Sequence, residues 1–244
     1  MTLSARGIQN ESSESPRLSR ELIVEAGMEI ASRPGTTSVK VRDLGTQLGV
    51  DPTAIYRHFR NKEELMSALL ERLIAMVASR STVDPLNWKA ALTELADNVL
   101  STYLDYPAVA AEAAILSTGG SAELDGIEFV LGSLSRAGLS GDELIEHYQL
   151  FSSHMLAFGS IIAQTEIARS RYSTAQRGSR DGAVERAYVP ETVGAMQSGH
   201  PTTASYREQL LALDDFSVYR TGIRMILDSA EAAAAARTGS VGQR

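Results

Sequence analysis

Hydrogen-bond donors gather in one short stretch of the sequence. Thr53, Tyr56 and Arg57 are three and four residues apart, so a helix would hold them on one side, and His58 follows directly. Hydroxyl, guanidinium and imidazole groups of this kind contact DNA phosphates and the edges of bases. The stretch therefore favours a helix that lies in the major groove of DNA.

Two short helices within residues 41–59 must hold these donors in place, and the turn between them has suitable residues. Gly49 can take the positive φ that ends a helix, and Asp51 can cap the next helix through its side-chain oxygen. Pro52 suits the first helical position, where its missing N–H costs nothing. The sequence therefore predicts a helix-turn-helix.

Four motifs surround this turn in a fixed order: KVRDL from residue 40, LGV from residue 48, AIYRHF from residue 54 and NKEEL from residue 61. Together, over about residues 17–70, they resemble the DNA-binding domain of the tetracycline-repressor (TetR) family. The resemblance and the donor chemistry implicate ten residues in DNA contacts: Thr37, Ser38, Arg42, Pro52, Thr53, Ala54, Tyr56, Arg57, His58 and Lys62.

Three positions in or just before the first helix of the predicted helix-turn-helix leave alternatives open or depart from the usual family sequence. Ser38 can donate to a phosphate or can instead cap the following helix. Lys40 stands where the family usually has a Ser or Thr cap, and Gly45 stands where it usually has Ala. A glycine inside a helix costs about 1 kcal/mol of helix propensity, so we expect this helix to be slightly loose.

Composition excludes several classes of protein. The chain has 244 residues, of which 43% are apolar, so it can bury a real core, and it has no cysteine for disulfide bonds. It contains no apolar run of about 18 residues and no N-terminal signal peptide. We therefore expect a soluble, cytoplasmic protein that does not associate with membranes.

The net charge of −7 is unusual for a DNA-binding protein, but it is unevenly distributed. Residues 1–80 carry 11 Lys and Arg against 10 Asp and Glu (+1), whereas residues 81–244 carry 12 against 20 (−8). DNA affinity would thus depend on a local patch of Arg42, Arg57, Arg60 and Lys62 rather than on the whole chain.

Helical periodicity without strand alternation predicts an all-α fold. We expect a disordered tail over 1–16, a three-helix DNA-binding domain with a linking helix over 17–80, and a larger helical effector-binding and dimerisation domain over 81–244. The linking helix begins near residue 62 and is apolar around more than one face, which indicates contact with both domains. Further helices are predicted at 87–105, 107–117, 121–137, 140–168 and 203–236.

Two apolar seams at heptad-like spacing occur in the second domain. The first contains Leu144, Tyr148, Phe151, Met155, Phe158 and Ile162, and the second contains Phe216, Tyr219, Ile223, Ile226 and Ala230. The spacing alone is equally consistent with the core of one chain. By resemblance these helices form a four-helix homodimer interface, which would let two reading helices bind a near-palindromic operator.

The resemblance also implies that the second domain binds a small apolar or amphipathic effector. Candidate pocket residues are Met76, Trp88, Tyr103, Phe129, Phe151 and His154, although packed core is the more ordinary role for each of these residue types. The connection 170–203 is either disordered or a lid. Effector binding would tilt the linking helix and release DNA, as in a repressor; the alternative is a regulator without an effector, whose second domain serves dimerisation or protein contacts.

Catalysis has little support in the sequence. Glu143, His147 and His154 fall close to one helical face and could hold a metal, but the two histidines flank the apolar seam, where a polar residue is ordinary. No Gly-rich phosphate loop, nucleophile elbow or HExxH motif occurs. We therefore expect no enzyme activity, no metal and no cofactor.

Overall fold

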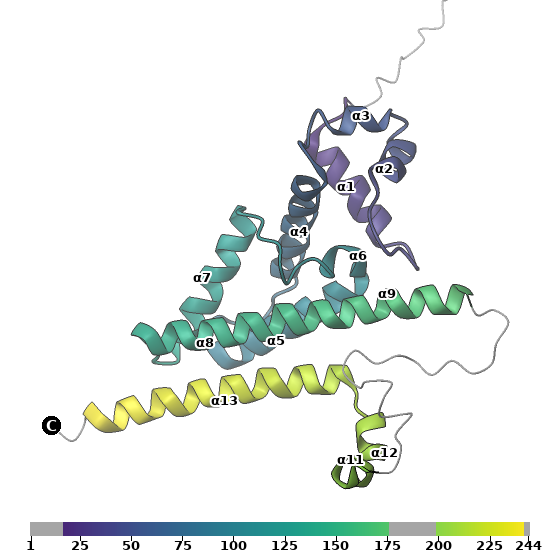
Figure 1. The fold of residues 1–244 in the computed structure, drawn as a ribbon. Coiled ribbons are helices and arrows are strands. Elements are labelled where there is room, and N and C mark those ends of the chain that lie inside the picture. Colours follow the sequence, from purple (N-terminus) through teal and green to yellow (C-terminus); the bar gives the residue numbers. More distant parts are fainter. Residues whose placement is uncertain (1–16, 176–198, 242–244) are drawn as a thin grey trace, which may run out of the picture.

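The computed structural model describes residues 17–175 and 199–241, and every regular element in these residues is a helix (Figure 1). The N-terminal part contains α1 (Arg20–Ala31), α2 (Val41–Leu48), α3 (Pro52–Ile55) and α4 (Lys62–Ser79). The rest contains α5 (Trp88–Asp105), α6 (Pro107–Ala110), α7 (Ser121–Arg136), α8 (Gly141–Ser153), the π-helix η1 (His154–Phe158), α9 (Gly159–Ala175), α11 (Pro201–Ser205), α12 (Arg207–Leu211) and α13 (Asp215–Val241). The predicted all-α fold is confirmed.

Helices α1 to α3 form a small unit at one end of the molecule, and α4 leads from it into the larger domain (Figure 1). Its buried side chains are Leu65, Met66, Leu69, Leu70, Leu73 and Val77. This helix packs against α1 on one side and against α5, α6 and α7 on the other. The predicted contact of the linking helix with both domains is therefore confirmed.

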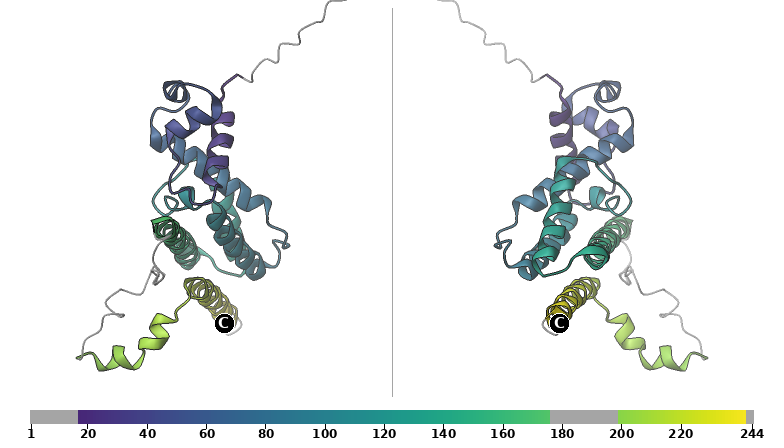
Figure 2. Two further views of the ribbon diagram at one scale, coloured as in Figure 1. Left: turned by 90° about the vertical axis from the view of Figure 1, so that its right-hand side faces the viewer. Right: turned by 90° about the vertical axis from the view of Figure 1, so that its left-hand side faces the viewer.

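In the larger domain, α8, η1 and α9 follow one another along a single line, and α13 lies beside them (Figures 1 and 2). Both views in Figure 2 show α13 as an outer layer, which packs against α5 as well as against α8 and η1. Helices α11 and α12 project away from this body near the beginning of α13 (Figure 1). Their residues include none that is buried.

Several predicted boundaries are wrong. The predicted helix 107–117 ends after Ala110, because the chain then tightens into turns with i to i+3 hydrogen bonds such as that from Ile115 N to Glu112 O. The predicted closing helix 203–236 is interrupted before Asp215, where the Asp214 side chain accepts from Ser217 N at 3.0 Å and so caps α13.

The predicted tail 1–16 lies outside the described residues, as does most of the connection predicted over 170–203. Helix α9 continues to Ala175 and α11 begins at Pro201, so both ends of that connection are helical. Whether the part between them is a lid or disordered lies outside the described residues.

Four of the seam residues predicted for the dimer interface are buried within one chain. Phe151 and Tyr219 are 0% exposed, and Met155 and Ile223 are also buried. Fully buried side chains have no further surface to lose when a second copy binds. Their helices pack against each other in the same chain, which is the alternative that the spacing had left open.

The remaining seam residues assigned to the interface are only partly buried and pack against the same core. They are Leu144, Tyr148, Phe158, Phe216 and Ile226. At the centre of the seam, His154 Nε2 donates to the Tyr219 carbonyl oxygen at 3.0 Å and its ring stacks on Tyr219. Gly222 permits this contact, because a Cβ there would overlap the His154 ring.

Candidate nucleic-acid interface

The helix-turn-helix has the turn geometry expected from its residues. Gly49 has φ of 66°, and Asp51 Oδ1 accepts from Thr53 N at 2.8 Å with Pro52 at the first helical position. The regular part of α3 is shorter than predicted and ends at Ile55, but i to i+3 and i to i+4 bonds continue through Phe59. The predicted turn is therefore confirmed, and the second helix ends in a looser turn.

The second element of the helix-turn-helix presents one apolar side and one polar side. Ile55 and Phe59 are 0% and 1% exposed and anchor it in the core. Thr53, Tyr56 and Arg57 are exposed, and the Thr53 hydroxyl donates to Asp51 Oδ1 at 2.6 Å. Tyr56 and Arg57 can donate hydrogen bonds to phosphates and base edges from this side, and the Thr53 hydroxyl can accept from a base edge.

The other predicted DNA contacts lie on α2, α3, the turn after α3, the beginning of α4 and the connection before α2, at the end of the molecule that is distant from α13 (Figure 1). Arg42 and Lys62 are exposed. Thr37, Ser38, Pro52, Ala54 and His58 are partly buried. Lys40 makes no side-chain hydrogen bond at the cap of α2, whereas Asn61 caps α4 by accepting from Glu64 N at 2.8 Å.

The lack of a side chain at Gly45 has a structural reason that the sequence does not show. A Cβ at this position would lie 2.9 Å from the Val50 carbonyl oxygen and 3.2 Å from Pro52 Cγ. An alanine would therefore press against the turn that positions the second helix. The expectation of a loose α2 considered only helix propensity; the close approach of the turn accounts for the glycine.

An arginine that sequence reasoning missed clamps the end of the reading element. Arg20 Nη1 donates to the His58 carbonyl oxygen at 3.0 Å and to Glu64 Oε1 at 2.8 Å, and its guanidinium lies 4.2 Å from the centre of the Phe59 ring. Glu64 Oε2 also accepts from Arg60 N at 2.8 Å. The clamp joins α1, the turn after α3 and α4, so it holds the exposed donors in one orientation.

Acid is expected to release this clamp. The bond from the Arg60 backbone, followed by that from the Arg20 side chain, lowers the pKa of Glu64 from 4.5 to about 2. Because the pKa is lower in the folded state, the stabilisation is complete above about pH 5 and is lost as the pH falls toward 2. Thermal unfolding should show Glu64→Gln to be less stable than the wild type near pH 7, with the difference disappearing at low pH. A difference that does not vary with pH would contradict this assignment.

The six residues predicted to line an effector pocket lie in or against the hydrophobic core. Tyr103 and Phe151 are buried, and the other four are Met76, Trp88, Phe129 and His154. None of the six lines either of the two cavities described, which have volumes of about 560 Å³ and 230 Å³. The larger cavity is an open cleft between the DNA-binding end and the beginning of α7, and most of the residues that line it carry polar or charged groups.

The histidines considered as metal ligands have hydrogen-bond partners within the protein. His147 Nδ1 lies 2.8 Å from the Glu143 carbonyl oxygen, and its Nε2 lies 3.4 Å from Ser229 Oγ. His154 is bonded to Tyr219 as described above. Among the residues described, no group of three or more His, Cys, Asp or Glu is arranged to hold a metal ion.

A three-helix unit with a helix-turn-helix, joined through α4 to a larger helical domain, defines a helix-turn-helix DNA-binding protein. Residues 23–69 match the family model for bacterial regulatory proteins of the tetR family, and residues 84–230 match the tetracyclin repressor-like C-terminal domain. The chain therefore belongs to the TetR family. It is a DNA-binding transcriptional regulator and not an enzyme.

Individual relatives agree with this membership. The chain is 28% identical to the HTH-type transcriptional repressor DrrR1 of Streptomyces coeruleorubidus over 92% of its own length and 81% of that protein. It is 25% identical to an HTH-type transcriptional repressor of Mycobacterium tuberculosis over 86% of its length and 79% of that protein. The fold is similar to that of ActR from Streptomyces coelicolor, with a TM-score of 0.68 and 17% identity over 89% of this chain and 98% of ActR.

Among the described residues, no helix combines the length and the apolar character that a membrane span requires.

Proposed function

We propose that this protein is a homodimeric repressor that binds a near-palindromic operator and is released from it by a small apolar or amphipathic effector. The observation that carries the proposal is the exposed donor side of Thr53, Tyr56 and Arg57, clamped in place by Arg20 and Glu64. One such short element provides little affinity, so two copies related by a two-fold axis are needed to read two half-sites. Chromosomal DNA lies in the cytoplasm, which is the proposed compartment.

The face proposed for dimerisation is the outer side of α8 and α13 and not the seam between them. Ile145 and Leu150 on α8 are 54% and 56% exposed, and Val218 and Met225 on α13 are 36% and 65% exposed. Val218 and Met225 are seven residues apart, so they project from the same side of α13. Apolar side chains that are repeatedly exposed along packed helices are typical of a surface that a second copy covers.

Release by an effector is supported by the structural relatives. ActR, which has the same fold, is described in complexes with actinorhodin and with (S)-DNPA. In this chain, α4 contacts both the DNA-binding end and helices α5 to α7. A ligand that binds more tightly when α4 is tilted would move the two reading elements away from their half-site spacing and so weaken DNA binding.

A binding screen tests this part of the proposal. Duplexes selected from random DNA by the wild-type protein serve as the operator, and actinorhodin, (S)-DNPA and tetracycline are the first compounds. An effector is expected to weaken DNA binding by about 5- to 150-fold, the usual range of allosteric coupling. A compound without differential affinity for the two states would leave the gel shift unchanged.

The alternative is a TetR-family regulator without an effector, whose second domain serves dimerisation or protein contacts. It is favoured by one observation: the six predicted pocket residues lie in or against the core, and none of them lines either described cavity. Failure of a wide panel of amphipathic compounds to change DNA binding, together with an intact dimer, would support this alternative.

A further inference from the structure

A single carboxylate joins the linking helix α4 to the first turn of α7. Glu71 Oε1 accepts from the Ala122 backbone N–H at 2.6 Å, and Glu71 Oε2 accepts from the Thr118 hydroxyl at 2.6 Å. Ala122 lies within α7 and Thr118 lies in the loop that precedes it. The acceptor therefore comes from the helix that enters the DNA-binding end, and both donors come from the second domain.

The loop that receives Glu71 is held in shape by a second carboxylate. Glu123 Oε2 accepts from Thr118 N at 2.8 Å and from Gly119 N at 2.7 Å. Gly120 N donates to Thr118 Oγ1 at 3.0 Å. These bonds fix Thr118 independently of Glu71, so the loop offers a preformed site for a carboxylate from α4.

The fit around this carboxylate requires a residue without a side chain at position 120. A Cβ on Gly120 would overlap the Glu71 carboxylate. The backbone φ of Gly120 is −91°, which alanine adopts readily, so the conflict comes only from Glu71. Gly120 is therefore explained by the close approach of the Glu71 side chain.

The residue that follows Glu71 makes the opposite connection. Arg72 Nε lies 2.8 Å from Glu25 Oε1 on α1, within the DNA-binding end. Adjacent positions on α4 thus bind the two domains separately. Glu71, Thr118 and Gly120 also lie in the wall of the polar cleft of about 560 Å³, which Arg20, Arg60 and Glu63 line from the DNA-binding side. A change in the angle of α4 would change the width of this cleft.

We propose that Glu71 is a positioning residue, whose bonds to Ala122 and Thr118 set the angle of α4 against α7 and hence the position of the reading element. Without them the DNA-binding end samples more orientations, and its ordering on DNA becomes less favourable. The inference deepens the proposed function and rests on it only in requiring that α4 carries the reading element.

Two different substitutions break the same contact. Glu71→Ala removes both acceptors, whereas Gly120→Ala keeps the carboxylate and displaces it. Each is expected to weaken binding to the selected duplexes by about fivefold or more, because about fivefold corresponds to a loss of about 1 kcal/mol of binding free energy. In the double variant, Gly120→Ala should add nothing, because alanine at position 71 leaves the space empty.

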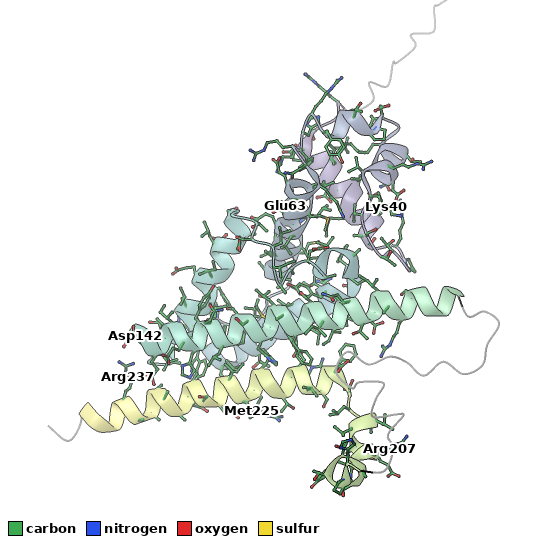
Figure 3. All side chains as sticks on the ribbon, in the orientation of Figure 1. Lys40, Glu63, Asp142, Arg207, Met225 and Arg237 are labelled. Carbon is green, nitrogen blue, oxygen red and sulfur yellow. The ribbon has the colours of Figure 1, made fainter. Side chains whose placement is uncertain are left out.

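The control is Glu63→Ala, which removes an equal charge from the beginning of the same helix, where Glu63 also lines the cleft. Figure 3 shows Glu63 on the DNA-binding side of the molecule, and the residue is exposed. If charge near the DNA were the cause, this control would change affinity as much as Glu71→Ala. Thermal unfolding of every variant separates a change of position from a loss of folding.

The angle itself can be measured because the chain has no cysteine. Cysteines introduced by Lys40→Cys and Asp142→Cys, two exposed positions on opposite domains (Figure 3), carry spin labels. Dilution with unlabelled protein restricts the measured distances to one chain. Glu71→Ala and Gly120→Ala should each broaden or shift the distance distribution, and Glu63→Ala should not.

Either of two results would overturn the proposal. One is an unchanged distance distribution in Glu71→Ala and Gly120→Ala. The other is a changed distribution with unaltered affinity for DNA, which would leave Glu71 a purely structural role. Neither measurement needs an effector. If every compound in the effector screen failed, release by an effector would be contradicted, while the distance and affinity measurements would still test the role of Glu71.

Discussion

A variant in which Arg57 is replaced by alanine is expected to lose sequence preference more than general affinity for DNA. Its side chain is exposed on the reading element beside Thr53 and Tyr56. A guanidinium that pairs with a base edge contributes about 1–3 kcal/mol of discrimination, so Arg57→Ala should relax the choice of base at one position of each half-site. Thr53→Ala should act similarly at a neighbouring position. Selection from random duplexes at fixed salt measures both effects.

The matched comparison is with two residues expected to contact only the phosphate backbone. Tyr56→Phe removes one hydroxyl, and Lys62→Ala removes a charge at the beginning of α4, so both should weaken binding to all sequences alike. Lys62→Ala should also reduce the slope of log affinity against log salt by about 1. If all four substitutions reduced binding equally for every sequence, Arg57 and Thr53 would have no base-reading role.

Replacement of Met225 by glutamate is expected to dissociate the dimer and, with it, binding to a two-half-site operator. Met225 is 65% exposed near the middle of α13, so a charge there leaves the core of one chain intact. Buried against a second copy, the two symmetry-related carboxylates would be desolvated and unpaired, at a cost of several kcal/mol. Sedimentation velocity should show a monomer, and affinity for the operator should fall by about tenfold or more.

Ile115→Glu provides the control for this experiment. Ile115 is 85% exposed in the turns after α6, so it introduces the same charge in place of an exposed apolar residue away from α8 and α13. It should leave the sedimentation of the protein unchanged. A dimer that persists in Met225→Glu would show that two copies do not associate through this face of α13.

The relation between sequence and structure differs between the two ends of the molecule. In the helix-turn-helix, Gly49 and Asp51 act on their immediate neighbours, so their roles could be predicted from local spacing alone. Gly45 differs, because its need for a small residue comes from Val50 and Pro52 across the turn. Helix propensity describes one helix at a time and contains no information about this approach.

The second domain shows the same limit on a larger scale. The heptad spacing of the seam around Phe151 and Tyr219 correctly predicted that two helices pack together, but it does not state which chain supplies the partner. Only the folded chain shows that α8 and η1 meet α13 of the same molecule and leave Met225 outside. The six predicted pocket residues are of types common to cores and cavity walls, so residue type alone does not separate the two.

By itself the sequence determined the class of this protein, because the donors, the turn and the cap of the reading element lie within about ten residues of one another, where spacing controls geometry. Only the tertiary structure decided what holds that element in place. Arg20 meets Glu64 and Glu71 meets Ala122 across separations of 44 and 51 residues. Such contacts depend on how whole helices pack, and the periodicity of one helix does not identify the helix that packs against it.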